Sequence, residues 1–216
     1  MSTARAIVAA AVCPHPLLMF RELGGASDPI SEARAASLAA VAAVAAVADE
    51  VVVVGGTDAY FSSPQVGVEP DPLSIRVGRR LLADAGALLP GDDVVIAWDA
   101  DVAQAAALGA SLGEDDVQTA LLVMGDLSAR RAPEGGPGTY DERAAGFDAR
   151  VEDALATGDP AALAALDTVL GDQLMVAGRA ALQVLSGVPA PDAAEVTYAA
   201  APYGVGYVVA RWTFGG

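Results

Sequence analysis

Apolar positions along the chain gather in short unbroken runs, and longer stretches with a helical spacing of apolar residues separate them. Four runs, at residues 4–12, 51–54, 94–98 and 120–124, are nearly all hydrophobic. Such runs are typical of strands that are covered on both faces, as in parallel sheets. The stretches between and after them predict helices over residues 28–48, 71–85, 100–112, 140–156 and 172–185, and a further short helix that begins at residue 159.

Aspartate followed by proline marks the start of three of these helices, at residues 28, 71 and 159. Aspartate is favoured as an N-cap, and proline at the first helical position. Residues 195–201 and 205–212 are rich in β-formers and are joined by a Pro-Tyr-Gly turn, which predicts a hairpin. The pattern predicts an α/β fold with a mixed, mainly parallel central sheet, helices on both faces and a C-terminal β-hairpin. Because no stretch has the composition of a linker, we expect one domain over residues 1–216.

Composition narrows the range of partners. Apolar residues make up 54% of the chain, the formal net charge is −16, and all twelve basic residues are arginine. Nucleic acids and anionic membrane surfaces both attract basic patches, so neither is an expected partner. The most hydrophobic window, residues 35–54, contains Asp49 and Glu50, which fits a helix followed by a strand rather than a membrane span. A single cysteine cannot form an internal disulfide and the chain start lacks a signal-peptide pattern, so the expected compartment is the reducing cytoplasm.

The first predicted strand runs into a loop that carries the only histidine of the chain, His15, and ends at the only cysteine, Cys13. Open α/β sheets place ligands at the ends of their strands, and prolines on both sides of His15 fix the loop that holds it. The two residues are two positions apart, so in extended chain they project to the same side. The pair is either a nucleophile with its base, or a buried cysteine packed as a small apolar group with His15 hydrogen-bonded nearby.

Further candidate binding residues follow the other strands and the last turn. The run Gly55-Gly56-Thr57-Asp58 either wraps an anion with its backbone amides or forms a tight turn. In Gly125-Asp126-Leu127-Ser128, Asp126 is either a ligand or base, or a cap for the next turn. Arg130 and Arg131 either hold a carboxylate or form a solvated pair. A segment that starts at Tyr203 either lines a pocket or only forms the hairpin turn. The predicted pocket residues are Cys13, Gly56, Thr57, Ser128 and Tyr203.

Three segments occur in an order that resembles a known family. They are Cys-Pro-His-Pro-Leu-Leu at residues 13–18, the strand at 51–54 with its glycine turn, and Val-Met-Gly-Asp-Leu-Ser at 123–128. The chain resembles the class III extradiol ring-cleavage dioxygenases of the LigB type and the related Memo-like proteins. Within them it is most similar to an alanine-rich actinobacterial branch whose function is unassigned. The resemblance implies a mixed central sheet flanked by helices, in agreement with the pattern above, and a homodimer.

The resemblance also implies a particular iron site. Enzymes of the family hold Fe(II) with two histidines and a carboxylate, and use a further histidine as acid and base. His15 matches the first ligand. The second ligand belongs where this chain has Gly55, Gly56 and Thr57, and the acid/base histidine belongs where it has Ala129. No motif places the carboxylate ligand, for which the candidates are Asp172 and Glu195.

This departure from the family pattern has a chemical consequence. One imidazole per chain cannot supply the two imidazoles and one carboxylate of a non-haem ferrous oxygenase site. We therefore expect ring-cleaving activity to be absent and no cofactor to be bound. A divalent metal stays open as an alternative, because Asp58 or Asp126 in place of a histidine would favour Mg²⁺, Ca²⁺ or Mn²⁺ over Fe²⁺.

Three functions remain open from the sequence. The first is a LigB-like protein that keeps the cleft and binds a small molecule or a protein partner. The second is a diverged enzyme, either a dioxygenase with altered ligands or a hydrolase or lyase, that uses His15 with Asp58 or Asp126. The third is a structural interaction protein whose cleft is filled by side chains.

Overall fold

The computed structural model describes residues 7–25, 27–57, 71–87, 92–113, 117–132 and 136–215. A six-stranded sheet runs through these residues in the order β3-β2-β4-β1-β6-β5. The first four strands pair in parallel, whereas β6 pairs antiparallel with both β1 and β5. The predicted fold class, including the C-terminal hairpin, is therefore confirmed. The strands are β1 (Ile7–Cys13), β2 (Glu50–Gly56), β3 (Asp93–Ile96), β4 (Thr119–Met124), β5 (Ala193–Ala200) and β6 (Tyr207–Thr213).

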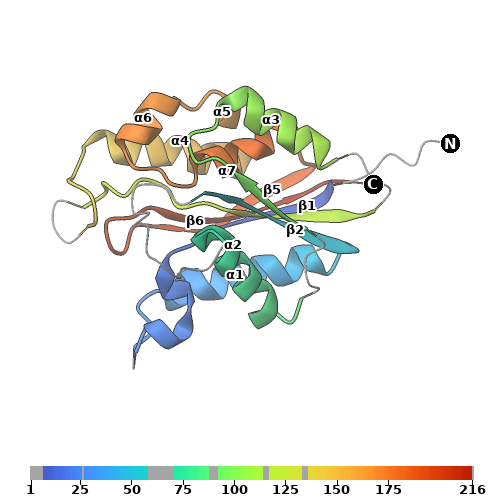
Figure 1. Ribbon diagram of the computed structural model, residues 1–216, viewed down its shortest axis with the longest axis horizontal. Coiled ribbons are helices and arrows are strands. Elements are labelled where there is room, and N and C mark those ends of the chain that lie inside the picture. Colours follow the sequence, from blue (N-terminus) through green and yellow to red (C-terminus); the bar gives the residue numbers. More distant parts are fainter. Residues whose placement is uncertain are drawn as a thin grey trace.

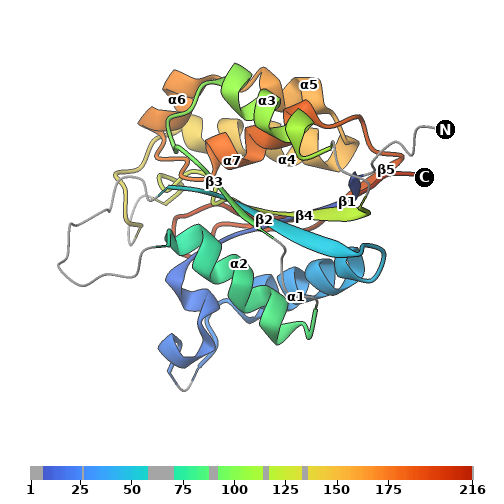
Figure 2. The same ribbon diagram turned by 45° about the vertical axis from the view of Figure 1, so that its right-hand side comes forward.

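Helices cover both faces of the sheet (Figures 1 and 2). One face carries α1 (Ser31–Ala45) and α2 (Leu73–Asp84). The other carries α3 (Val102–Ser111), α4 (Arg143–Thr157), α5 (Pro160–Ala164), α6 (Thr168–Gln173) and α7 (Arg179–Val184). Three short 3₁₀ turns complete the described elements: η1 (Leu17–Met19), η2 (Arg21–Leu23) and η3 (Leu185–Gly187). None of the described helices is both long enough and apolar enough to cross a membrane.

The sheet separates two hydrophobic clusters, and β1 contributes alternate residues to each. Ala10 and Val12 face the cluster under α3–α7, whereas Ala9, Ala11 and Cys13 face the cluster under α1 and α2. This alternation explains why the strand has almost no polar position, because both of its faces are covered. Each large side chain fully buried in such a core contributes about 1.5–3 kcal/mol.

Two of the three predicted aspartate caps are wrong. The side chain of Asp28 pairs with Arg34 (3.1 Å) instead of capping α1, and that of Asp71 pairs with Arg79 (2.5 Å) instead of capping α2. A guanidinium carries a full positive charge and several N–H donors, so the nearby arginines take these carboxylates. Asp159 has no such competitor in the described contacts, and it caps α5 by accepting from two backbone amides at 2.9 and 3.0 Å.

The single helix predicted over residues 172–185 is also wrong. The chain breaks into α6 and α7 between Gln173 and Arg179, and Met175 takes a left-handed conformation with φ of 56°. In this break, Gly178 lies against the backbone of Gly125, which follows β4. The remaining predicted elements begin and end within a few residues of the observed ones. The break matters because it brings new residues to the ends of the parallel strands.

Candidate functional site

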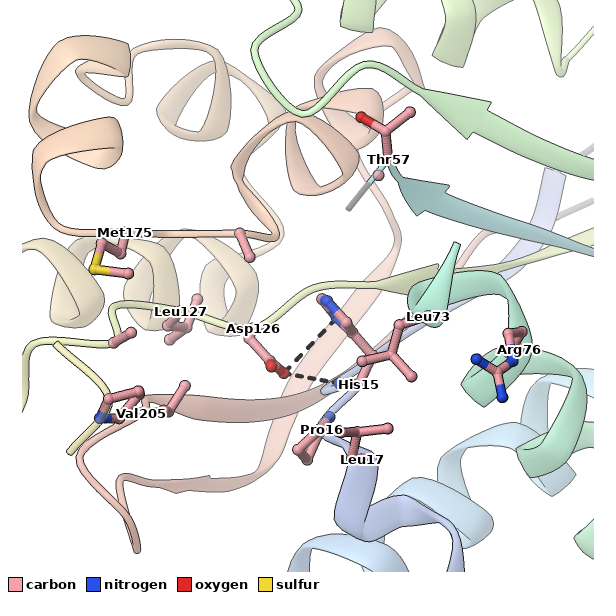
Figure 3. Close-up of a pocket in the computed structure, with 14 residues that line it drawn as sticks. His15, Pro16, Leu17, Thr57, Leu73, Arg76, Asp126, Leu127, Met175 and Val205 are labelled. Carbon is pink, nitrogen blue, oxygen red and sulfur yellow. Dashed lines mark hydrogen bonds and ion pairs between the residues drawn. The ribbon is translucent and has the colours of Figure 1, made fainter. Parts of the chain in front are cut away.

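A cavity of about 340 Å³ lies at the carboxyl ends of β1, β2 and β4 (Figure 3). Open α/β sheets bind their ligands in this position, outside the carboxyl ends of the strands. Its volume falls at the lower end of the range typical of small-molecule sites. Most of its lining is apolar. The lining residues are His15, Pro16, Leu17, Gly56, Thr57, Leu73, Arg76, Asp126, Leu127, Ala129, Pro137, Met175, Ala177 and Val205.

Strand pairing aligns the ends of β1, β2 and β4, so the loops that follow them begin side by side. Met124, at the end of β4, pairs with Cys13 at the end of β1 and with Gly55 near the end of β2. The amide of Gly125 then donates to the carbonyl of Cys13 at 2.9 Å, which continues the ladder by one residue. The residues that follow the three strands therefore emerge side by side, as the sequence predicts for parallel strands.

His15 and Asp126 form the polar centre of the cavity (Figure 3). The backbone N–H of His15 donates to Asp126 Oδ1 at 2.8 Å, and His15 Nδ1 lies 3.8 Å from the same oxygen. The two side chains are only 12% and 15% exposed. Burial raises the pKa of the Asp126 carboxyl, against the opposing effect of His15. His15 Nδ1 is buried and makes no hydrogen bond with the described residues.

Two glycines in close contact hold the main chain of Asp126. The amide of Gly178 donates to the carbonyl of Asp126 at 2.9 Å. A Cβ atom at Gly178 would overlap the backbone of Gly125, so the break between α6 and α7 can approach the end of β4 only because both residues lack a side chain. This contact fixes the loop after β4 and places Met175 and Ala177 in the cavity wall.

Gly55 and Gly56 do not form the predicted turn. They are the last residues of β2, where they pair with Val95 and Ile96 of β3. A side chain at Gly55 would overlap Ser74 of α2, so the close approach of this helix explains the glycine. Thr57 lines the cavity beside them. Its backbone N–H donates to the carbonyl of Ile96 at 2.8 Å, so this amide does not serve an anion. Asp58 lies outside the described residues.

Three of the predicted pocket residues lie outside the cavity lining. Cys13 is fully buried against α1, with Sγ 4.0 Å from the carbonyl of Ser37, and burial raises the pKa of its thiol to about 12. A thiol with this pKa is protonated at neutral pH and is not a nucleophile. Ser128 is fully buried, and its hydroxyl donates to the carbonyl of Leu174 at 2.8 Å. Tyr203 is 44% exposed, although Val205 of the same segment lines the cavity.

The described residues do not fit the iron site that the family resemblance implies. They contain no group of three or more His, Cys, Asp or Glu side chains that could hold a metal ion. The described lining residues of the cavity offer one imidazole and one carboxylate, where the ferrous site needs two imidazoles and a carboxylate. Of the two candidate carboxylate ligands, Asp172 lies 3.6 Å from Arg179, and Glu195 pairs with Arg211 on the last hairpin. Neither of them lines the cavity.

A second buried carboxylate, Asp148 of α4, supports the loop behind the cavity. Its Oδ1 accepts from the amide of Ser128 at 3.0 Å, and its Oδ2 accepts from Arg131 at 2.8 Å. Arg131 thus binds a carboxylate, but one that belongs to the protein itself. Burial raises the pKa of Asp148 to about 6, even though the Ser128 amide and Arg131 both lower it. The pair fixes the course of the chain from Leu127 to Arg131.

Sequence reasoning missed several residues of the cavity wall, among them Met175 and Arg76. A glycine inside the predicted helix over residues 172–185, Gly178, was a signal that this helix breaks. No comparable signal marks Arg76, whose position depends on how α2 sits on the sheet. The guanidinium carbon of Arg76 lies over the Phe20 ring, 5.7 Å from its centroid.

Fold and site together define an α/β protein with a ligand-sized cavity at the carboxyl ends of its parallel strands. No family model matches the chain, and no curated protein matches it. Among solved structures, the chain is similar to the uncharacterized protein JW3007 from Escherichia coli K12, with a TM-score of 0.49 and 13% sequence identity. That similarity covers 96% of this chain and 100% of the other. None of these comparisons names a family for the protein.

Proposed function

We propose that this chain is a LigB-like protein that has kept the substrate cleft of the family, lacks ring-cleaving activity and binds a small organic molecule. The observation that carries the proposal is the cavity of about 340 Å³ centred on His15 and Asp126. Both residues belong to the segments that resemble the family, at 13–18 and 123–128. An apolar cavity with a few convergent polar groups and a perturbed carboxyl is the usual form of a binding site. An open cavity also argues against a cleft filled by side chains.

The donor atoms support the absence of ring cleavage. The whole chain has one histidine, and the positions where the family carries its other histidines hold Gly55, Gly56, Thr57 and Ala129. A ferrous oxygenase site therefore lacks an imidazole, and the acid/base histidine is missing as well.

Reconstitution with iron tests this part of the proposal. The purified protein is incubated anaerobically with Fe²⁺, desalted and analysed for metal content, and then mixed with catechol and oxygen. We expect iron well below one ion per chain and no ring-opened product in the absorption spectrum. Stoichiometric iron together with catechol cleavage would overturn the proposal. Parallel samples with Mn²⁺ and Mg²⁺ test the oxygen-rich alternative that Asp58 or Asp126 would allow.

A fragment screen tests the binding function. Ligand-observed NMR with a library of small organic molecules is run on the parent protein and on two variants, His15→Ala and Cys13→Ala. The second variant is the matched control, because Cys13 lies two residues away but is buried outside the cavity. We expect His15→Ala to keep the fold and lose the fragments, while Cys13→Ala keeps them. Fragments that bind equally well to all three proteins, or an His15→Ala variant that only unfolds, would contradict the proposed site.

A diverged hydrolase or lyase is the second candidate function, and the contact between His15 and Asp126 favours it. A carboxylate beside Nδ1 can orient an imidazole whose Nε2 acts as a general base. In that case turnover of a substrate found by screening should fall about 100-fold or more in Asp126→Asn, while binding is retained. Loss of binding and turnover in parallel would assign Asp126 to ligand binding and not to catalysis, and ligands that bind without any turnover would favour the binding protein.

The homodimer and the cytoplasmic location stay predictions. The homodimer comes from the resemblance, and sedimentation that shows only monomer at micromolar concentration would contradict it. The location comes from the single cysteine, which is buried and has no disulfide partner.

A further inference from the structure

The sulfur-containing side chains of the protein differ in their access to solvent. The chain has four methionines and one cysteine, and all of them except Met1 lie in the described residues. Cys13 and Met124 are 0% exposed and Met19 is 1% exposed, because all three belong to the cluster under α1 and α2. Among these four, Met175 alone is not fully buried, and it lies in the cavity wall (Figure 3). A small reagent in solution therefore reaches Met175 more readily than the other three.

The main chain at Met175 is held in place from both sides. Its φ of 56° is left-handed, and no other described residue apart from glycine has a positive φ. The neighbouring side chains of Leu174 and Val176 are buried in the core. The carbonyl of Leu174 accepts the hydroxyl of Ser128 at 2.8 Å and the amide of Ala129 at 3.2 Å. A strained residue persists only where its surroundings fix it, so a small shift of the main chain does not remove Met175 from the cavity wall.

The sulfur of Met175 packs closely against a glycine. A Cβ atom at Gly138 would lie 3.2 Å from Met175 Sδ, so this contact leaves little room for a larger group. Leu127 and Val205 are apolar residues of the same wall. An oxygen atom added to the sulfur would therefore press on Gly138 or enter the cavity. Either way, a polar S=O group would replace part of an apolar wall, where a polar group without a hydrogen-bond partner is unfavourable.

We infer that Met175 is a site of oxidation by hydrogen peroxide, and that its conversion to the sulfoxide changes the cavity wall from apolar to polar. One oxygen atom passes from the peroxide to the thioether: the S–O bond forms, the O–O bond breaks and water leaves. The sulfur loses two electrons and the peroxide gains them. Because reductases exist for methionine sulfoxide, this change has the form of a switch. Its effect on ligand binding rests on the proposed function, whereas the oxidation itself does not.

Mass spectrometry of the folded protein tests the position of the oxidation. The parent is treated with hydrogen peroxide for increasing times, quenched with catalase and digested, and the gain of one oxygen atom is followed in the peptides of Met19, Met124 and Met175. We expect Met175 to react at least about tenfold faster than either buried methionine, since these react only when the core opens. Equal rates at the three residues, or no oxygen at Met175, would overturn the inference.

Two variants test what the oxidation does to the cavity wall. Met175→Leu removes the sulfur from the wall, and Met19→Leu is the matched control because it removes a buried sulfur and keeps Met175. Circular dichroism checks the fold of both. We expect peroxide to shift the methyl NMR signals of Leu127 and Val205 in the parent and in Met19→Leu, but not in Met175→Leu. Unshifted signals in the parent, or the same shifts in Met175→Leu, would contradict the inference.

The fragments whose binding depends on His15 provide a further measurement. We expect oxidation to weaken their binding about tenfold in the parent and in Met19→Leu, and to leave it unaltered in Met175→Leu. Fragments that bind the oxidised parent as tightly as before would show that the sulfoxide does not change the cavity. If the screen finds no fragment that depends on His15, the proposed function fails, but the order of oxidation and the methyl spectra still decide this inference.

Discussion

Asp126 lies in the loop that follows β4, and Asp148 of α4 supports the same loop, but the two side chains have different partners. Both are largely buried, both accept one backbone N–H from a neighbouring loop residue, and burial raises the pKa of both. Asp148 also binds the guanidinium of Arg131 at 2.8 Å. Asp126 instead has the imidazole of His15, whose Nδ1 lies 3.8 Å away and makes no hydrogen bond.

This difference separates a structural carboxylate from one that is ready for a ligand. A buried charge costs several kcal/mol unless it is paired and hydrogen-bonded, and for Asp148 the Ser128 amide and the guanidinium of Arg131 offset part of this cost within the protein. Asp126 has no guanidinium among its described contacts, and Nδ1 of His15 beside it makes no hydrogen bond. An incompletely paired group in a cavity is where a protein gains most from a bound molecule. Mutations on the two sides of the loop should therefore have different effects.

The largest effect is expected from removing the partner of Asp148. Arg131→Met keeps most of the side-chain volume but leaves the carboxyl without its cation. We expect the free energy of unfolding at neutral pH to fall by about 2 to 3 kcal/mol, at the low end for a broken buried pair because Arg131 is 25% exposed. Urea denaturation of the parent and the variant measures the change. A loss within experimental error would show that Asp148 needs no cation, and Asp148 would then no longer differ from Asp126 in this respect.

The same variant has a defined pH dependence. In the parent, the pKa of Asp148 is raised from 3.8 to about 6, so the folded protein holds this proton more tightly than the unfolded chain does. The stability that this group contributes is therefore full below pH 3.8 and is lost as the pH rises through about 6. Because a neutral Asp148 needs no counter-ion, Arg131→Met should differ little from the parent at acidic pH and most at neutral pH. If Arg131→Met lost the same free energy of unfolding at acidic and at neutral pH, the loss would come from packing and not from the charge of Asp148.

A smaller effect is expected on the side of Asp126, from Gly178→Ala. The added methyl group would overlap the backbone of Gly125, so we expect a loss of about 2 kcal/mol in the free energy of unfolding and weaker binding of any cavity ligand. Gly146→Ala is the control, because a Cβ there meets no atom within 4 Å and α4 should gain up to about 1 kcal/mol. If both variants gained stability, the contact between the two glycines would not fix the loop.

The smallest effect on stability is expected from Asp126→Asn. Asparagine keeps an oxygen for the N–H of His15 and resembles the protonated acid, which burial already favours at this position. The free energy of unfolding should change by less than about 1 kcal/mol, while the affinity for a cavity ligand should change about tenfold. A loss of stability as large as that of Arg131→Met would mean that Asp126 is structural too, and the two carboxylates would no longer differ.

The succession of strands and helices and the position of the site followed from local pattern, and several details did not. Unbroken apolar runs predicted the buried strands, and their ends marked His15, Asp58 and Asp126 as candidate site residues. The structure brings His15 and Asp126 together, whereas Asp58 lies outside the described residues. Tertiary contacts decided the rest. Arginines took two of the predicted caps, Ser74 of α2 explained Gly55, and the close approach of Gly178 to the end of β4 broke a predicted helix. These contacts join residues that no local pattern of spacing or propensity connects.

The cavity wall is assembled from both layers of the molecule. Leu73 and Arg76 come from α2 on one face of the sheet, whereas Met175 and Ala177 come from the break between α6 and α7 on the other. A molecule bound there would contact both helical layers at once and would link them at the carboxyl ends of the parallel strands. Binding would raise the melting temperature. At a ligand concentration one hundred times Kd, the free energy of unfolding would increase by about 2.7 kcal/mol. Slower amide exchange in both layers would accompany it.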